Sequence, residues 1–461
     1  MKKLRMGKLF LWLMAFGIWP VNAVRGAELH RTPIYSGTQA IAAVTAGDFD
    51  PLHPGLELAC LLANGSIMEL ALEASGWTTN ILFQRPGFAW DTPATRVSLS
   101  VGDVLYNNPG QEIVVNIERQ LIVVYYGPSG WTNQIVADLT AFVGTAWGAE
   151  IGDCDPSNAG EEIFFIFEGV LDFSFGTVYA RSTGGWKENI VYNAEVGMDS
   201  VIGDSNPDVA GNEIIVVTEM GPAYEILPPP AGGAGPWPKR TIWDDFDNAG
   251  WVVKLADVDP ASPGNELVYG TRYSDRILMS RFNGTNRHTV DILMTGINTN
   301  QFSSMFDVAA GQVFNASPAA EIFGVDGSGS LYLVQQMINQ WVGSVLWQDS
   351  NALYAVLTAD LIPTPGNEVI AAGASGKVFL FYNPSPTLSL TLTAQQQPVL
   401  SWLALQGWTY HIEKTTNLTS IPIWSPVTNL TSGAFIGTLN YTNPEPATQA
   451  AWFRLRSTLS P

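Results

Sequence analysis

The sequence predicts an all-β fold, a closed ring of seven four-stranded β-sheets followed by a small β-sandwich. A short pattern recurs seven times, roughly every fifty residues, which is typical of repeat proteins whose units bury their apolar faces against one another. The chain contains 44 glycines and 29 prolines, and no stretch shows useful amphipathic helical periodicity. These observations favour many short strands joined by turns.

Each repeat begins with an apolar strand that ends in a Gly-Asp or Ala-Asp pair. A loop rich in Pro and Gly follows, and a Glu then opens a run of Ile, Leu and Val. The pairs stand at Gly47-Asp48, Gly102-Asp103, Gly152-Asp153, Gly203-Asp204, Ala256-Asp257, Ala310-Gly311 (a degenerate copy) and Ala359-Asp360. The continuous apolar runs predict strands that are covered on both faces, as in stacked sheets.

The fourth strand of most repeats has a Trp with an aliphatic residue four positions later. This pattern occurs at Trp77, Trp131, Trp186 and Trp341. An indole buries a large area, so we interpret the Trp as a packing anchor between neighbouring sheets; ligand stacking is the alternative.

The two ends of the repeat region complement each other. The last repeat has no fourth strand after residues 378–381, whereas Ile34 lies ahead of the first repeat at the spacing of a fourth strand. We therefore expect residues 24–36 to complete the seventh sheet and close the ring, which removes exposed edge strands.

The N-terminus has the pattern of a secretory signal peptide. A basic start, an apolar core and a small-residue cleavage site span residues 1–23. We expect a ring over 24–382, a linker over 383–386 and a β-sandwich over 387–461. No other apolar stretch reaches the roughly 18 residues that a membrane helix needs. The mature protein is thus expected to be secreted, periplasmic or at the cell surface.

Composition excludes some classes of function. The formal net charge of −20 disfavours binding to nucleic acid. Cys60 and Cys154 lie in different repeats and are expected to be unpaired. The four histidines are scattered along the sequence, so it shows no His cluster for zinc or iron.

The repeat loop, Gly-Asp-x-Asp-Pro followed by Pro-Gly-x-Glu-Leu, resembles the FG-GAP/VCBS repeats of seven-bladed β-propellers such as integrin heads. The resemblance covers residues 30 to 382, and in that family the loop wraps a calcium ion. It implies Ca²⁺ ligands in four repeats: Asp48, Asp50 and Glu57; Asp153, Asp155 and Glu162; Asp204, Asn206, Asp208 and Glu213; Asp257, Asp259 and Glu266.

The loops also depart from the family pattern. They are usually one residue longer, end in Glu rather than Asp, and mostly lack the fifth-position carboxylate. Calcium takes six to eight oxygens, so carbonyls and water would have to complete each site. In the alternative interpretation the loops hold no metal, and each Asp caps its own loop through backbone N–H groups.

The C-terminal segment resembles the fibronectin-III-like modules of exported bacterial proteins. The resemblance rests on Leu400-Ser401-Trp402, Trp408 to Glu413 and Trp452 to Leu455. It implies attachment or spacing rather than chemistry.

These features predict an exported, non-catalytic binding protein that recognises a glycan or a protein. The alternative is an extracellular carbohydrate-active enzyme, a polysaccharide lyase or a glycosidase, and Asp244, Asp245 and Asp247 are the acidic cluster that could serve a glycosidase. A purely structural cell-surface component is the third interpretation. The sequence identifies no catalytic residue and does not indicate the oligomeric state.

Overall fold

The computed structural model describes residues 29–90, 97–105, 108–142, 144–158, 160–169, 173–228, 237–245, 249–262, 264–272, 276–282, 288–295, 305–314, 319–337, 340–364, 366–383, 389–395, 397–405, 408–415, 423–432, 436–444 and 452–459. All their regular structure is β-strand, which confirms the predicted all-β class. Within these ranges no helix is long and apolar enough to cross a membrane.

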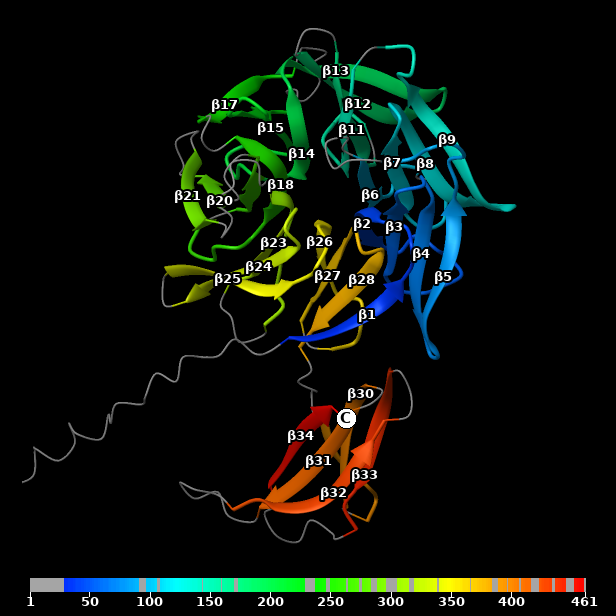
Figure 1. The fold of residues 1–461 in the computed structure, drawn as a ribbon, viewed down its shortest axis with the longest axis vertical. Coiled ribbons are helices and arrows are strands. Elements are labelled where there is room, and N and C mark those ends of the chain that lie inside the picture. The colour runs from blue at the N-terminus through cyan, green and yellow to red at the C-terminus, as the bar shows by residue number, and fades with distance from the viewer. Residues whose placement is uncertain are drawn as a thin grey trace, which may run out of the picture.

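Seven of the sheets in the described residues have four antiparallel strands, and we call them blades 1 to 7 (Figure 1). Blade 1 contains β2 (Ile41–Gly47), β3 (Glu57–Leu62), β4 (Ile67–Glu73) and β5 (Gly76–Phe83); blade 2 contains β6 (Ser98–Gly102), β7 (Glu112–Ile117), β8 (Gln120–Gly127) and β9 (Gly130–Asp138); blade 3 contains β10 (Ala146–Gly152), β11 (Glu162–Glu168), β12 (Phe173–Ser182) and β13 (Gly185–Glu195).

The next three blades repeat this order. Blade 4 contains β14 (Gly197–Gly203), β15 (Glu213–Thr218), β16 (Pro222–Ile226) and β17 (Lys239–Asp244); blade 5 contains β18 (Gly250–Ala256), β19 (Glu266–Thr271), β20 (Arg276–Phe282) and β21 (His288–Thr295); blade 6 contains β22 (Met305–Gly311), β23 (Glu321–Asp326), β24 (Ser330–Met337) and β25 (Gln340–Gln348).

Blade 7 joins the two ends of the repeat region. Its strands are β26 (Leu353–Ala359), β27 (Glu368–Gly373), β28 (Lys377–Tyr382) and, from the N-terminus, β1 (His30–Ser36). β1 pairs antiparallel with β28, with His30 opposite Tyr382 and Ser36 opposite Lys377. The N-terminal strand thus supplies the outermost strand of this sheet, the place that the spacing of Ile34 predicts for it.

The blades form a closed ring of β-propeller type. The first strand of each blade contacts the first strand of the next, and β26 of blade 7 contacts β2 of blade 1. Figure 1 shows these strands around the centre of the ring. Each cluster of buried apolar side chains forms mainly between two neighbouring blades, as in the cluster that unites Leu61 of blade 1 with Val115 of blade 2. Every blade therefore depends on its neighbours for its core.

Burial falls from the second strand of a blade to the fourth. All six residues of β3 and of β7 are buried, whereas β9 is mostly exposed or half-buried. Trp131 in β9 packs edge-on against Phe49 of blade 1, with ring centroids 6.2 Å apart, as a packing anchor should. The aliphatic residues after three of the Trp positions are instead solvent-exposed; they are Ile81, Ile135 and Ile190.

The C-terminal residues form two three-stranded antiparallel sheets. One contains β29 (Ser389–Leu392), β30 (Pro398–Leu405) and β33 (Ile436–Thr442); the other contains β32 (Ser425–Thr431), β31 (Trp408–Thr415) and β34 (Trp452–Leu459). Trp402 and Tyr410, one from each sheet, are buried with ring centroids 5.7 Å apart. Both cysteines are buried and free.

Candidate functional site

The Glu that opens the second strand of each blade is a buried structural residue. Each of the seven is at most 2 % exposed; they are Glu57, Glu112, Glu162, Glu213, Glu266, Glu321 and Glu368. In six of them one carboxylate oxygen accepts two backbone N–H groups from the preceding loop, at 2.7 to 3.3 Å. Glu213 accepts the N–H and the hydroxyl of Ser205. We call these residues the latch glutamates.

Burial changes the acidity of the latch glutamates. It raises the pKa of Glu57 to about 7, although the N–H groups of Asp50 and Phe49 act in the opposite direction. The pKa is raised to about 6 at Glu112 and to about 7 at Glu213 and Glu368 for the same reason. A hydrogen bond to a buried carboxylate is worth more than a neutral one, so the latches fix each loop onto its blade.

The third loop position also turns inward. Asp50, Asp155, Asn206 and Asp259 are buried. Each accepts, through Oδ1, the backbone N–H of the residue two positions later, at 2.8 to 3.2 Å. This is the Asx-turn that the metal-free interpretation describes.

The first-position side chains lie on the surface. Asp48, Asp153, Asp204, Asp257 and the fifth-position Asp208 are exposed. The backbone carbonyls of Asp48, Asp153 and Asp204 accept hydrogen bonds from the next blade, as in the 2.8 Å hydrogen bond that the Asn212 side-chain amide donates to the Asp153 carbonyl. The first and third positions thus face different surroundings. Calcium binding at the loops stays a prediction.

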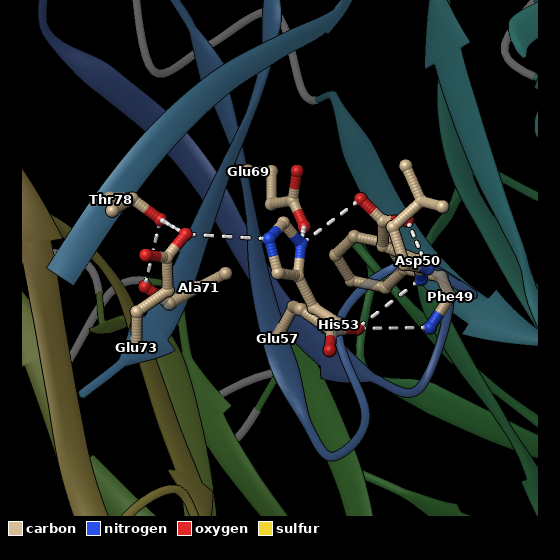
Figure 2. Close-up of polar contacts among 9 residues, drawn as sticks. Phe49, Asp50, His53, Glu57, Glu69, Ala71, Glu73 and Thr78 are labelled. Atoms are coloured by element: carbon tan, nitrogen blue, oxygen red, sulfur yellow. Dashed lines mark hydrogen bonds and ion pairs between the residues drawn. The ribbon is translucent and has the colours of Figure 1, made fainter.

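Within the described chain, one group of at least three His, Cys, Asp or Glu side chains brings its ligand atoms within 4.8 Å of one another, and sequence reasoning missed it. It consists of Asp50 and His53 in the loop after β2 and Glu69 in β4 (Figure 2). His53 Nδ1 lies 3.2 Å from Asp50 Oδ2 and 3.3 Å from Glu69 Oε1. Both acids are 1 % exposed, whereas the His53 side chain is 34 % exposed.

The two acids and the imidazole influence one another. Burial raises the pKa of Glu69 to about 7, and the Asp50 carboxylate adds to this shift. Burial lowers the pKa of His53, but the carboxylates of Glu69 and Asp50 outweigh it, so the net shift is upward. The group therefore holds positive charge readily.

Comparison between blades shows what is particular to His53, which lies four residues before its latch glutamate. At the same place, Asn108, Asn158 and Thr364 donate a hydrogen bond to the second oxygen of their latch, at 2.7 to 3.0 Å. His53 faces Asp50 and Glu69 instead. A His at a position that holds Asn or Thr in three other blades, and a Glu inside the apolar run Ile67 to Leu70, were the signals in the sequence.

The opposite ends of the innermost strands form a second site, at the central channel. Six of these strands have a β-bulge at their second residue. The bulged residues are Ala42, Trp147, Met198, Trp251, Phe306 and Tyr354. A bulge redirects a side chain out of the regular pleat.

Aromatic side chains surround a cavity of about 100 Å³ in this channel. Its lining includes Trp90, Trp147, Trp251, Phe306 and Tyr354. Tyr354 lies 5.0 Å from Trp90 and 5.8 Å from Phe306, measured between ring centroids. Aromatic residues of the loop before β6 and of four blades thus meet at one end of the channel, and we call these five residues the aromatic mouth.

Charged groups line the same cavity. Glu150, Asp199, Asp307 and Lys254 all contribute to it. Lys254 Nζ lies 3.5 Å from Glu150 Oε1, and Glu150 is the largest influence that raises the pKa of Lys254, with Asp199 and Asp307 adding to it. Asp199 and Asp307 each accept a backbone N–H from the innermost strand of the next blade. The donors are Val253, 3.0 Å from Asp199 Oδ2, and Val356, 2.9 Å from Asp307 Oδ2. In the lining that the structure describes, one cation therefore lies among three carboxylates.

The acidic cluster considered for a glycosidase is only partly described. Asp244, at the end of β17, and Asp245 are exposed, and Asp247 lies outside the described residues.

Comparison with known proteins identifies no family. No family model and no curated relative matches the chain. Among solved structures, BBS1N in complex with ARL6DN has 11% sequence identity and a TM-score of 0.47, covering 78% of this chain and 97% of that chain. The Dos1 propeller has 9% identity and a TM-score of 0.46, covering 75% and 78%. We assign the β-propeller fold from the sheet topology described above; the FG-GAP and fibronectin-III-like assignments stay predictions.

Proposed function

We propose that this chain is an exported, non-catalytic binding protein that takes a basic side chain of a protein partner into the aromatic mouth of its central channel. The observation that supports this most is the meeting of five aromatic side chains over Glu150, Asp199 and Asp307. Aromatic faces and carboxylates both attract a cation.

The size of the cavity favours a single side chain over a larger ligand. Pockets for whole small molecules enclose roughly 300 to 1,000 Å³. The channel cavity, at about 100 Å³, is well below that range. A Lys or Arg side chain projecting from a protein surface fits such a space.

Charge supports the same class of partner. Lys254 offsets one of the three carboxylates, which leaves an acidic lining. The chain as a whole has a net charge of −20, which attracts a basic partner at long range. One of the rings already accepts a cation of this chain, because the Arg272 guanidinium lies 4.7 Å from the centre of the Trp251 ring.

The test uses isothermal titration calorimetry with short acetylated peptides that carry one Arg, one Lys, one citrulline or one Glu in the same glycine-rich frame. We expect the Arg and Lys peptides to bind and the citrulline and Glu peptides to bind at least tenfold more weakly. The F306A/Y354A double variant removes two half-buried rings and should weaken Arg-peptide binding about tenfold, a factor that corresponds to roughly 1.4 kcal/mol.

The matched control is Phe142→Ala, which removes an exposed aromatic ring in the loop after β9. Equal binding of the Arg and citrulline peptides, or unchanged binding in F306A/Y354A, would overturn the proposal. Retention of a neutral oligosaccharide together with no peptide binding would also overturn it and identify a glycan ligand instead.

A further inference from the structure

Blade 1 holds two buried carboxylates and one imidazole in contact, outside the channel. Asp50 Oδ2, Glu69 Oε1 and His53 Nδ1 point toward one another from a loop and from β4 (Figure 2). From this geometry we propose that Asp50, His53 and Glu69 bind a divalent transition-metal ion of the Zn²⁺ class.

The spacing of the ligand atoms fits such an ion. Bonds of about 2.1 Å in a tetrahedral arrangement place neighbouring ligand atoms about 3.4 Å apart. The distances from His53 Nδ1 to the two carboxylate oxygens are 3.2 and 3.3 Å. An ion between the three atoms requires only small side-chain movements.

Burial and charge create the demand for a cation. Asp50 and Glu69 are each 1 % exposed, so two carboxylates share one imidazole in a nearly dry site. Glu69 Oε2 is buried and has no hydrogen-bond partner among the described residues. An ionised carboxylate is costly to bury unless it is paired or coordinates a metal.

The surroundings orient the three ligands. His53 Nε2 lies 3.5 Å from Glu73 Oε1, and the Thr78 hydroxyl donates a hydrogen bond to that same oxygen, 3.3 Å away. A carboxylate on the second nitrogen is the usual outer partner of a metal-bound His. The latch Glu57 accepts a hydrogen bond from the backbone N–H of Asp50, and Asp50 Oδ1 accepts one from the backbone N–H of Leu52. Asp50 Oδ2 therefore remains for the ion.

The donor set selects the class of ion. Calcium prefers six to eight oxygen ligands, whereas an imidazole nitrogen with two carboxylates suits zinc and its neighbours. The partly exposed His53 leaves a path from solvent and room for a water as a fourth ligand. This site shares Asp50 with the predicted calcium set but replaces Asp48 and Glu57 with His53 and Glu69.

A protonated His53 could satisfy the same contacts without any metal, so the experiment must separate the two states. The mature full-length protein is stripped with EDTA, and Zn²⁺ is then titrated by calorimetry, with metal content measured after dialysis. We expect one zinc per chain and a higher melting temperature with zinc than with EDTA. Calcium at the same concentration should give neither effect at this site.

The variants locate the ion. His53→Asn recreates the side chain found at this place in blades 2 and 3, and Glu69→Gln keeps the shape of the acid; both should lose zinc binding at least tenfold. His411→Asn, in β31, and Asp48→Asn, at the exposed loop position, should bind zinc as the unmodified protein does.

A Co²⁺-substituted protein gives an independent readout, because its visible absorption should show nitrogen and oxygen coordination that His53→Asn abolishes. Absence of stoichiometric zinc in the unmodified protein would overturn the proposal. So would zinc binding that persists in both His53→Asn and Glu69→Gln, or binding lost only in Asp48→Asn. If His53→Asn fails to fold in EDTA, Glu69→Gln decides.

Discussion

Blade 1 and blade 4 each bury a carboxylate on the third strand, but a different side chain lies beside that carboxylate in each blade. Both have a buried Glu on the third strand, Glu69 opposite Ala59 and Glu225 opposite Ile215. In blade 4 the Arg240 guanidinium donates a hydrogen bond to Glu225 from the neighbouring strand β17. In blade 1 the residue at that place is Asn80, and the contact to Glu69 comes from His53.

Blade 5 extends the comparison to the loop. Asp259 occupies the position of Asp50, and Arg281 Nη1 lies 2.8 Å from its Oδ2. Blades 4 and 5 therefore balance one buried acid each with an Arg, whose charge is permanent. Blade 1 brings both acids to one point, and within the described part of the chain the group that pairs with them is the His53 imidazole. The positive charge beside these two acids is exchangeable, because it can be a proton on His53 or a bound metal ion. This exchangeable charge makes blade 1 a candidate for metal binding.

The largest expected effect comes from removing the permanent charge in blade 4. Arg240→Met leaves Glu225, which is fully buried, without its cation. We expect the free energy of unfolding to fall by about 3 kcal/mol. Urea unfolding of the full chain measures this loss. The R240M/E225Q double variant should recover most of the stability, and a double variant as unstable as R240M would show that packing, not charge, is the cause.

The pH dependence tests what all blades share, the latch glutamates. The pKa of Glu112 is raised to about 6, and those of Glu213 and Glu368 to about 7, from an ordinary 4.5. Between pH 4.5 and 7 the folded state therefore holds more protons than the unfolded state. The free energy of unfolding should fall as pH rises through this window, by on the order of 1 to 2 kcal/mol per latch.

Thermal unfolding at pH 5, 6, 7 and 8 measures this slope. Glu368→Gln retains a carbonyl acceptor but cannot titrate, so its stability should depend less on pH in the same window. Stability that rises between pH 5 and 7 would contradict the prediction.

The sequence predicts the framework of this fold because the framework repeats. The recurring apolar runs and the spacing of Ile34 lead to the sheets and to the pairing of β1 with β28. The loop chemistry is harder to predict because an Asp or Glu in a sequence does not reveal which donors it faces. Glu57 carries a carboxylate, the type of group that binds metal ions, but in the structure this carboxylate accepts two backbone N–H groups.

The candidate sites depend on departures from the repeat. The contact between His53 and Glu69 joins residues 16 apart on different elements, and no local pattern predicts it. The aromatic mouth depends on bulges that place Phe306 and Tyr354 at one end of the channel. A bulge depends on strand pairing, which residue identity alone does not reveal.

The smallest expected effect on stability is in blade 1, and it sharpens the contrast with blade 4. In EDTA at pH 7, His53→Asn should lower the free energy of unfolding by less than about 1 kcal/mol. The new Asn can donate a hydrogen bond to Glu57, as Asn158 does to Glu162. Glu69, with its pKa of about 7, can take up a proton in place of the lost imidazole contact. Urea unfolding of His53→Asn and of R240M under the same conditions compares the two losses of unfolding free energy. A loss in His53→Asn as large as that in R240M would mean that His53 acts as a fixed structural cation, as Arg240 does, and the two blades would then differ only in the side chain they use.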